Sequence, residues 1–121
     1  MTTTDDVAEV EQHIRDYIER WSAKDAAAVW TRYYRLDASQ RMKSQADVQA
    51  VFDELAADGF ARTEMHSVTA SLDGPDRATA KIRFTRWRTD GTSMPPENRG
   101  AVYALRRFPD GWRITAVGMA D

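Results

Sequence analysis

Rings that carry polar atoms gather in one short stretch, residues 14–34, which reads IRDYIERWSAKDAAAVWTRYY. Each ring combines a large apolar surface with a single hydroxyl or indole N–H, so it can wall a pocket and donate a hydrogen bond inside it. We predict that Tyr17 directs its hydroxyl into such a pocket. The predicted walls are Trp21, Trp30, Tyr33 and Tyr34. A solid core filled by the same rings is the alternative.

Two further residues could transfer protons, His66 and Asp37. Histidine changes its charge near neutral pH and is the commonest general base. Along the alternating segment 61–72, His66 shares its parity with Val68, so it faces the core if Val68 does. The alternative is a polar strand residue at an edge. Asp37 is the nearest carboxylate after the second predicted helix, but no spacing pairs it with His66.

Composition narrows the classes of function. A chain of 121 residues suits one domain, taken as 1–121, and the lack of cysteine excludes disulfides, thiolate ligands and thiol nucleophiles. Its two histidines have no metal-ligand spacing, so we predict neither a metal nor another cofactor. A net charge of −2 argues against nucleic acid binding. The acidic N-terminus and the lack of a long apolar run predict no membrane association and a cytoplasmic location.

Three helices are predicted first. Apolar residues spaced by three and four mark the first helix at Val7, Val10, Ile14, Tyr17 and Trp21. The second begins at the N-cap residue Asp25 and presents Ala26, Val29, Trp30 and Tyr33 on one face. The third begins with Ser44 and Asp47, which resemble a capping box, and ends at Gly59. Residues 35–42 are predicted to form a short strand or a loop.

Four strands follow, at 61–72, 77–89, 99–108 and 112–119, with turn residues after the first three. Helices followed by hairpin-linked strands predict an α+β fold with the helices on one face of an antiparallel sheet. The connection at 89–99 contains two prolines and Met94, an adaptable apolar side chain. It is a candidate lid that would bring Met94 to a ligand, or simply a long hairpin connection.

The alternation of apolar residues breaks in KIRFTRWR, residues 81–88. A β-bulge or a change of face near Thr85 would explain the break. We expect these arginines to cover a solvent-facing or dimer-facing side of the sheet, because the net charge is negative. One arginine could instead enter the pocket and hold a carboxylate.

Three segments carry a resemblance to a known family: WSAKDAAAVWTRYY, KSQADVQAVFDEL and RRFPDGWRITAV. They resemble the nuclear-transport-factor-2-like superfamily, which includes ketosteroid isomerases and SnoaL-like polyketide cyclases. The resemblance implies three N-terminal helices packed on a strongly curved, mainly antiparallel sheet that forms a cone with an internal pocket. It also implies a homodimer through the outer sheet face.

In ketosteroid isomerases a tyrosine and a protonated aspartate form an oxyanion hole, and another aspartate is the base. Tyr17 matches the tyrosine on the first helix, and Tyr103 lies where the second donor is expected. The base position falls near Arg41, four residues from Asp37. The resemblance thus implies one retained donor, a phenol in place of an acid and no matching base, so steroid isomerisation is not expected.

Two functions follow. The first is a cofactor-independent enzyme of the polyketide-cyclase, isomerase or dehydratase type acting on a hydrophobic carbonyl compound. Tyr17 and Tyr103 would polarise the carbonyl and His66 or Asp37 would move a proton. The alternative is a non-catalytic, dimeric module that binds a small hydrophobic molecule or serves as an accessory subunit.

Overall fold

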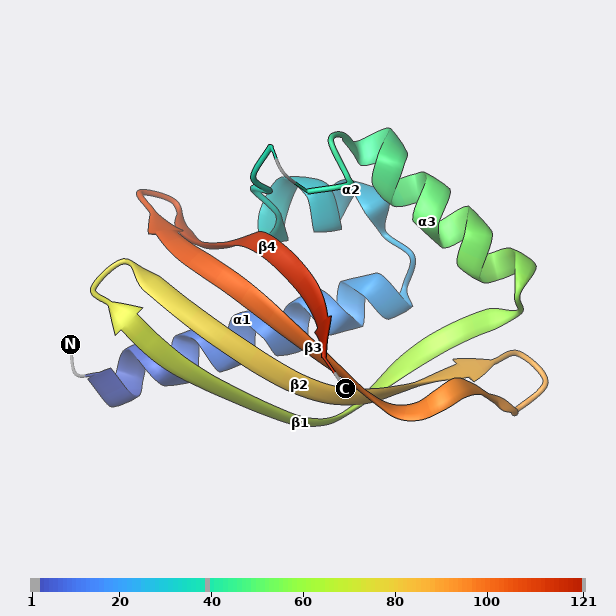
Figure 1. Cartoon of the computed structure of the whole chain (residues 1–121). Coiled ribbons are helices and arrows are strands. Elements are labelled where there is room, and N and C mark those ends of the chain that lie inside the picture. The colour runs from blue at the N-terminus through green and yellow to red at the C-terminus, as the bar shows by residue number, and fades with distance from the viewer. Residues whose placement is uncertain (1–2, 39, 121) are drawn as a thin grey trace.

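The fold consists of N-terminal helices followed by a curved antiparallel sheet (Figure 1). The computed structural model describes residues 3–38 and 40–120, with the side chains of 3, 4, 96, 119 and 120 left out. The helical elements are α1 (Thr3–Ser22), α2 (Ala26–Ala28), the π-helix η1 (Val29–Tyr33) and α3 (Gln45–Ala57). The strands are β1 (Phe60–Gly74), β2 (Arg77–Arg88), β3 (Ser93–Phe108) and β4 (Gly111–Ala120), in the order β1-β2-β3-β4. The predicted α+β class and antiparallel meander are confirmed.

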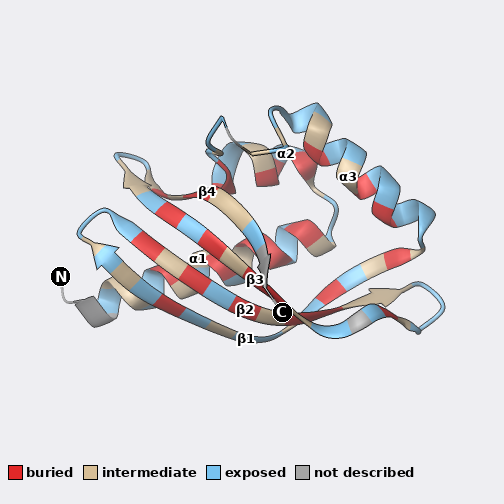
Figure 2. Ribbon diagram, in the orientation of Figure 1, coloured by how far each residue is buried: buried red, intermediate tan, exposed pale blue. Residues whose placement is uncertain are grey.

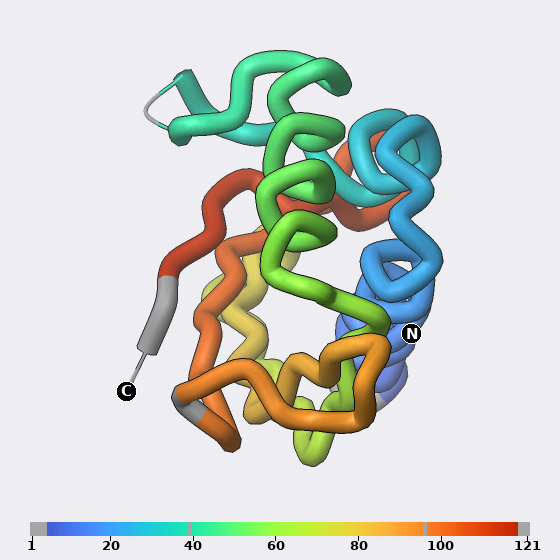
Figure 3. The backbone as a smooth tube through the Cα atoms, turned by 90° about the vertical axis from the view of Figure 1, so that its right-hand side faces the viewer, coloured from blue at the N-terminus to red at the C-terminus, as the bar shows by residue number. Residues whose placement is uncertain are grey.

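Helix α1 supplies the main helical surface of the core. Its apolar face is buried at Val10, Ile14, Tyr17, Ile18 and Trp21. Burying a large apolar side chain stabilises a fold by about 1.5–3 kcal/mol, so this face holds α1 against the sheet. Figure 2 marks buried residues along α1 and along the strands, and Figure 3 shows α1 and the strands in side view. No helix of the described residues is long and apolar enough to cross a membrane.

The second helical segment changes its winding after one turn. Asp25 caps it as predicted, because its carboxylate accepts a hydrogen bond from Ala28 N at 3.1 Å. The turn then widens, and Tyr34 N donates to Val29 O at 3.0 Å, a π-helical bond. Tyr34 leaves this turn in an extended conformation and forms a parallel bridge with Ile114. The sequence predicted the helix but not the wide turn.

Helix α3 closes the top of the fold. Ser44 Oγ accepts from Asp47 N at 3.3 Å, and the Asp47 carboxylate accepts from Lys43 N at 2.6 Å, one residue earlier than in a standard capping box. Gly59, with φ +88°, follows the last turn as predicted. Buried Phe52 meets the Trp21 ring edge-on at 4.7 Å between centroids, which fastens α3 to α1.

A bulge in β1 overturns the expected orientation of His66. Met65 pairs with Phe84 and Ser67 pairs with Arg83, so His66 is an extra residue in the ladder. The core-facing parity changes there, and His66 does not follow Val68 inward. His66 is exposed, and its Nε2 is hydrogen bonded to Thr85 Oγ1 at 2.7 Å.

The predicted irregularity at Thr85 is confirmed, and it also corrects the expectation of a free loop at 89–99. Strand β3 already begins at Ser93, with Met94 paired to Arg86 and Arg99 paired to Phe84. The residues between Met94 and Arg99 form a bulge, which Thr85 Oγ1 holds by accepting from Asn98 N at 3.1 Å. Prolines are tolerated in a strand at such a bulge, where no ladder N–H is required. The candidate lid is therefore part of the sheet.

His13 gives a prediction about acid stability. Its ring packs on Tyr33 at 5.0 Å and its Nε2 has no partner among the described residues. Burial, assisted by the Arg113 charge, lowers the pKa of His13 from 6.5 to about 4. The unfolded chain therefore binds a proton that the folded chain excludes, and stability falls as pH falls from 6.5 towards 4. By pH 4.5 the loss from this residue should be about 2 kcal/mol.

Urea unfolding of the wild type and of His13→Leu at pH 7.5 and 4.5 measures this loss. The carboxylates titrate in both proteins, so the difference between the two proteins isolates His13. An equal loss of unfolding free energy in both would contradict the prediction.

Candidate functional site

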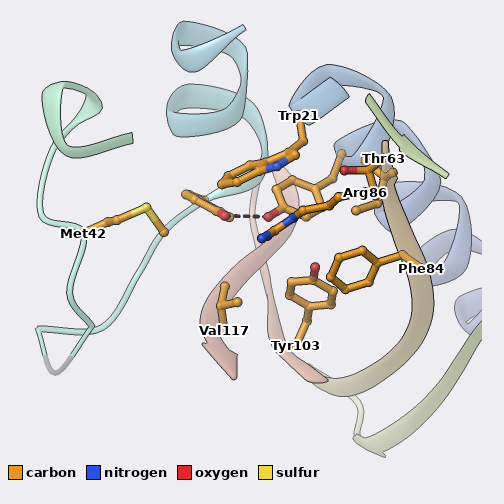
Figure 4. Close-up of a pocket in the computed structure, with 10 residues that line it drawn as sticks. Trp21, Met42, Thr63, Phe84, Arg86, Tyr103 and Val117 are labelled. Carbon is orange, nitrogen blue, oxygen red and sulfur yellow. Dashed lines mark hydrogen bonds between the residues drawn. The ribbon is translucent and has the colours of Figure 1, made fainter. Parts of the chain in front are cut away.

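A small cavity lies between α1, the chain that leaves η1 and the inner face of the sheet (Figure 4). Its volume is about 70 Å³. The wall is mainly apolar, with hydroxyls and one guanidinium as its polar groups. The lining residues are Tyr17, Ile18, Trp21, Tyr34, Met42, Thr63, Phe84, Arg86, Tyr103 and Val117.

Three buried tyrosines meet at this cavity. The hydroxyls of Tyr17 and Tyr34 are hydrogen bonded at 2.6 Å, and their rings lie 5.4 Å apart. The Tyr103 ring meets Tyr17 edge-on at 5.5 Å. Besides burial, a side-chain hydrogen bond with Tyr17 raises the pKa of Tyr103, so the three hydroxyls are linked and keep one O–H between them. The cluster can therefore donate a hydrogen bond to a ligand oxygen.

These tyrosines are donors and not bases. Burial is the first cause that raises the pKa of Tyr17, Tyr34 and Tyr103 well above its ordinary value. The mutual repulsion of the ionised forms raises the pKa of Tyr17 and Tyr103 further. All three are neutral phenols at physiological pH, as an oxyanion-stabilising donor must be.

Arg86 supplies the charge of the cavity. It lies on β2 opposite Thr63 of β1, and both residues face inward. Neither the Nε of Arg86 nor the Oγ1 of Thr63 has a hydrogen-bond partner among the described residues. Burial lowers the pKa of Arg86, and the nearby charge of Arg99 lowers it further. An arginine keeps its charge through such a shift, so the cavity holds a cation.

The structure brings together some of the predicted residues and separates others. Tyr17, Trp21, Tyr34 and Tyr103 line the cavity. Tyr33 is buried and packs on Tyr17 at 6.2 Å between ring centroids, but it is not part of the lining.

The predicted proton carriers lie outside the cavity. Asp37 is exposed in an outer groove of about 580 Å³, which Trp30 also lines. Tyr34 and Met42 border both spaces and so form the partition between cavity and groove. His66 is exposed at the β1 bulge. Met94 is buried in the sheet and absent from the lining of both spaces.

The sequence did not predict Thr63 or Met42 as lining residues, and it left open whether one arginine of residues 81–88 enters the pocket; that arginine is Arg86. The signal for Arg86 was its parity with Ile82 and Phe84, both of which are buried. That parity was interpreted as a break in alternation, whereas the structure keeps Arg86 on the inner face. Among the described residues no group of three or more histidine, aspartate or glutamate side chains could hold a metal ion.

Comparison with known proteins places the chain in a family. Residues 8–121 match the model of a family described as NTF2-like protein (DUF6841). The chain belongs to this family. No curated protein matches it. The resemblance seen in the three sequence segments is therefore confirmed at the level of the NTF2-like superfamily, while the SnoaL-like subtype remains a proposal.

Solved structures share the fold. An NTF2-like protein with a cystatin-like fold from Novosphingobium aromaticivorans is similar at 25% identity and a TM-score of 0.70, over 93% of this chain and 79% of that one. A provisionally assigned aromatic ring hydroxylase from the same organism aligns at 15% identity and a TM-score of 0.71, over 98% and 90%. An NTF2-like superfamily protein from Salmonella enterica aligns at 16% identity and a TM-score of 0.62, over 98% and 92%.

The buried tyrosines give a prediction about alkaline pH. Above pH 10 the unfolded chain loses phenolic protons that the folded chain retains, so stability should fall as pH rises. Three of the four tyrosines should ionise only when the protein unfolds. Ultraviolet difference absorbance of tyrosinate, followed together with far-ultraviolet circular dichroism, checks this. Ionisation of most tyrosines before the loss of helix signal would contradict it.

Proposed function

We propose that this NTF2-like protein binds a small oxygen-bearing organic compound in the tyrosine cavity, as a binding module without acid–base catalysis. The proposal rests on the cavity itself, which is lined by the neutral side chains of Tyr17, Tyr34 and Tyr103. Its ten lining residues include no carboxylate and no histidine. A ligand oxygen would receive hydrogen bonds there, but no lining group is suited to accept a proton from carbon.

The cavity volume limits the size of this ligand. An apolar protein cavity of about 150 Å³ can hold benzene, and this cavity has about half that volume. A ligand that occupies it alone has only a few carbon atoms. A larger hydrophobic carbonyl compound, such as a steroid or an aromatic polyketide, would have to extend past Met42 into the outer groove.

A second candidate function is an enzyme of the isomerase or cyclase type. The observation that favours it is the shared border of the two spaces at Tyr34 and Met42. A carbonyl compound that spans this border would place its oxygen near Tyr17 and Tyr103 and its remaining carbons beside Asp37. Asp37 would then accept the proton from the carbon next to the carbonyl, and the phenols would stabilise the enolate oxygen.

We extend the proposal to a homodimer and to a cytoplasmic location. A homodimer through the outer sheet face would leave the cavity on the opposite face free. The outer face of β1, β2 and β3 carries a pocket of about 470 Å³ lined by Ser67, Thr69, Lys81, Ile82, Arg83, Gly100, Ala101 and Val102. A cytoplasmic protein with a small-molecule ligand and no nucleic acid partner remains the expectation.

The test of the binding function compares three tyrosine variants. A panel of ketones, aldehydes, amides and carboxylates of about three to six non-hydrogen atoms is screened by ligand-observed NMR, since compounds of this size match the cavity. Tyr17→Phe and Tyr103→Phe should each weaken the binding of a hit by about 5- to 10-fold, the effect of one lost hydrogen bond. Tyr33→Phe is the matched control, because Tyr33 is also buried and packs on Tyr17 but does not line the cavity.

Equal affinities in all three variants would refute the tyrosine site, and no binding across the panel would refute the cavity as a binding site.

Hydrogen–deuterium exchange separates the module from the enzyme. An enzyme that enolises a bound ketone would exchange its α-hydrogens with heavy water, and Asp37→Asn would abolish the exchange. A binding module leaves the α-hydrogens of the same ketone in place. We expect no exchange above the buffer rate, because Asp37 is exposed and lies outside the inner cavity.

A further inference from the structure

The cavity contains a positive charge without a matching negative charge in its wall. Arg86 is the single charged residue among the ten that line it. No acceptor for Arg86 Nε is found among the described residues, and the charge that affects the pKa of Arg86 most is that of another arginine, Arg99. The Nε of Arg99 is likewise buried without a partner. Transfer of a cation out of water without a counter-ion costs free energy, so this arrangement favours an anion.

The polar groups of the cavity are also mostly donors. A guanidinium has five N–H donors and no acceptor. Thr63 Oγ1 has an uncommitted hydroxyl, and its backbone is fixed by the bond from Thr63 N to Ser22 Oγ at 3.0 Å. The linked hydroxyls of Tyr103, Tyr17 and Tyr34 add one further O–H. An amide or alcohol could not accept from all of these, whereas a carboxylate has two oxygens with about four acceptor sites.

The sheet fixes the guanidinium in this place. Arg86 pairs with Thr63 on one side and with Met94 on the other, next to the bulge at Thr85. Its Cζ lies 5.4 Å from the centre of the Phe84 ring, so the charged group rests against an aromatic face. Figure 4 shows the guanidinium of Arg86 beside the dashed hydrogen bond, which joins the hydroxyls of Tyr17 and Tyr34. A preorganised arginine of this kind suits a planar, bidentate acceptor.

We propose that the ligand of the cavity is a small monocarboxylate, with its anion held by Arg86 and the tyrosine hydroxyls and its short alkyl group against Ile18, Trp21 and Val117. This inference deepens the proposed binding function, on which it rests, by naming the class of ligand. The volume of about 70 Å³ restricts the acid to about two to four carbons.

The experiment compares propionate with propionamide, which has nearly the same shape and no charge. Calorimetry on the wild type should give an affinity for propionate at least about tenfold higher than for propionamide, since hydrogen bonds between charged groups are the stronger ones. Arg86→Met should remove this preference. Arg83→Met is the matched control on the same strand, because Arg83 does not line the cavity, and it should keep the preference.

A stability measurement shows whether Arg86→Met folds and why it fails to bind. Removal of an unpaired, partly buried cation beside Arg99 should raise the melting temperature of the ligand-free protein. A variant with a raised melting temperature and no selectivity for propionate is the expected result. A lowered melting temperature with retained selectivity would overturn the role of Arg86.

The other outcomes also decide the matter. Equal binding of propionate and propionamide in the wild type would refute the carboxylate while leaving the tyrosine cavity as a binding site. If inorganic phosphate binds as tightly as propionate, the cavity is a site for anions in general and the proposal of a carboxylate-specific site is overturned. The absence of binding for propionate, propionamide and every other compound of the panel would refute both the proposed function and this inference.

Met42 tests the size limit independently. Benzoate carries the same anion on a ring too large for the cavity, so it should bind the wild type much more weakly than propionate does. Met42→Ala removes part of the partition to the outer groove and should admit benzoate without weakening propionate. Wild-type affinity for benzoate equal to that for propionate would show that the carboxylate binds elsewhere.

Discussion

The hydrogen bond between Tyr17 and Tyr34 is the contact on which the site depends. It joins the middle of α1 to the chain that leaves η1, and both hydroxyls are buried. Loss of this bond would leave a buried hydroxyl without its partner, at a cost of about 1–3 kcal/mol. The π-turn makes the contact possible, since the extra residue in the turn redirects Tyr34 before it pairs with Ile114. The aromatic stretch is therefore ordered by one bond that spans two elements.

Irregularities of the sheet place the remaining groups. Thr85 accepts from Asn98 N and is hydrogen bonded to His66, so a single hydroxyl joins the irregular parts of β1, β2 and β3. His66 thus has a structural partner on the strand beside it, which explains why a histidine stands at this bulge without facing the cavity. The same region leaves Arg86 on the inner face opposite Thr63. The bulges fix which side chains enter the cavity.

The sequence predicted the elements well because each has a local cause. Asp25, Ser44 and Gly59 mark helix ends through hydrogen bonds and a positive φ that depend on a few neighbouring residues. The sequence predicted Tyr17, Tyr34 and Tyr103 for two reasons. Rings with polar atoms cluster at residues 14–34, and Tyr17 and Tyr103 match the positions of hydrogen-bond donors in the family that the chain resembles. His66 was misplaced because strand parity holds only between bulges, and a bulge in β1 cannot be located from alternation alone. The π-turn at 29–33 has no comparable sequence signal, so the sequence did not reveal that Trp30 lines the outer groove and that Tyr33 lines neither space.

Arg86 shows why function is harder to predict than fold. An arginine is not expected on the strand face that carries the buried residues Ile82 and Phe84, because a buried cation beside Arg99 opposes folding. The fold tolerates it because the surrounding apolar contacts of α1, α3 and the sheet supply enough stability. Proteins keep such locally unfavourable groups where binding requires them, and a ligand that neutralises the charge removes the cost in the bound state. The residue that fits the core pattern least is therefore the one most informative about the ligand.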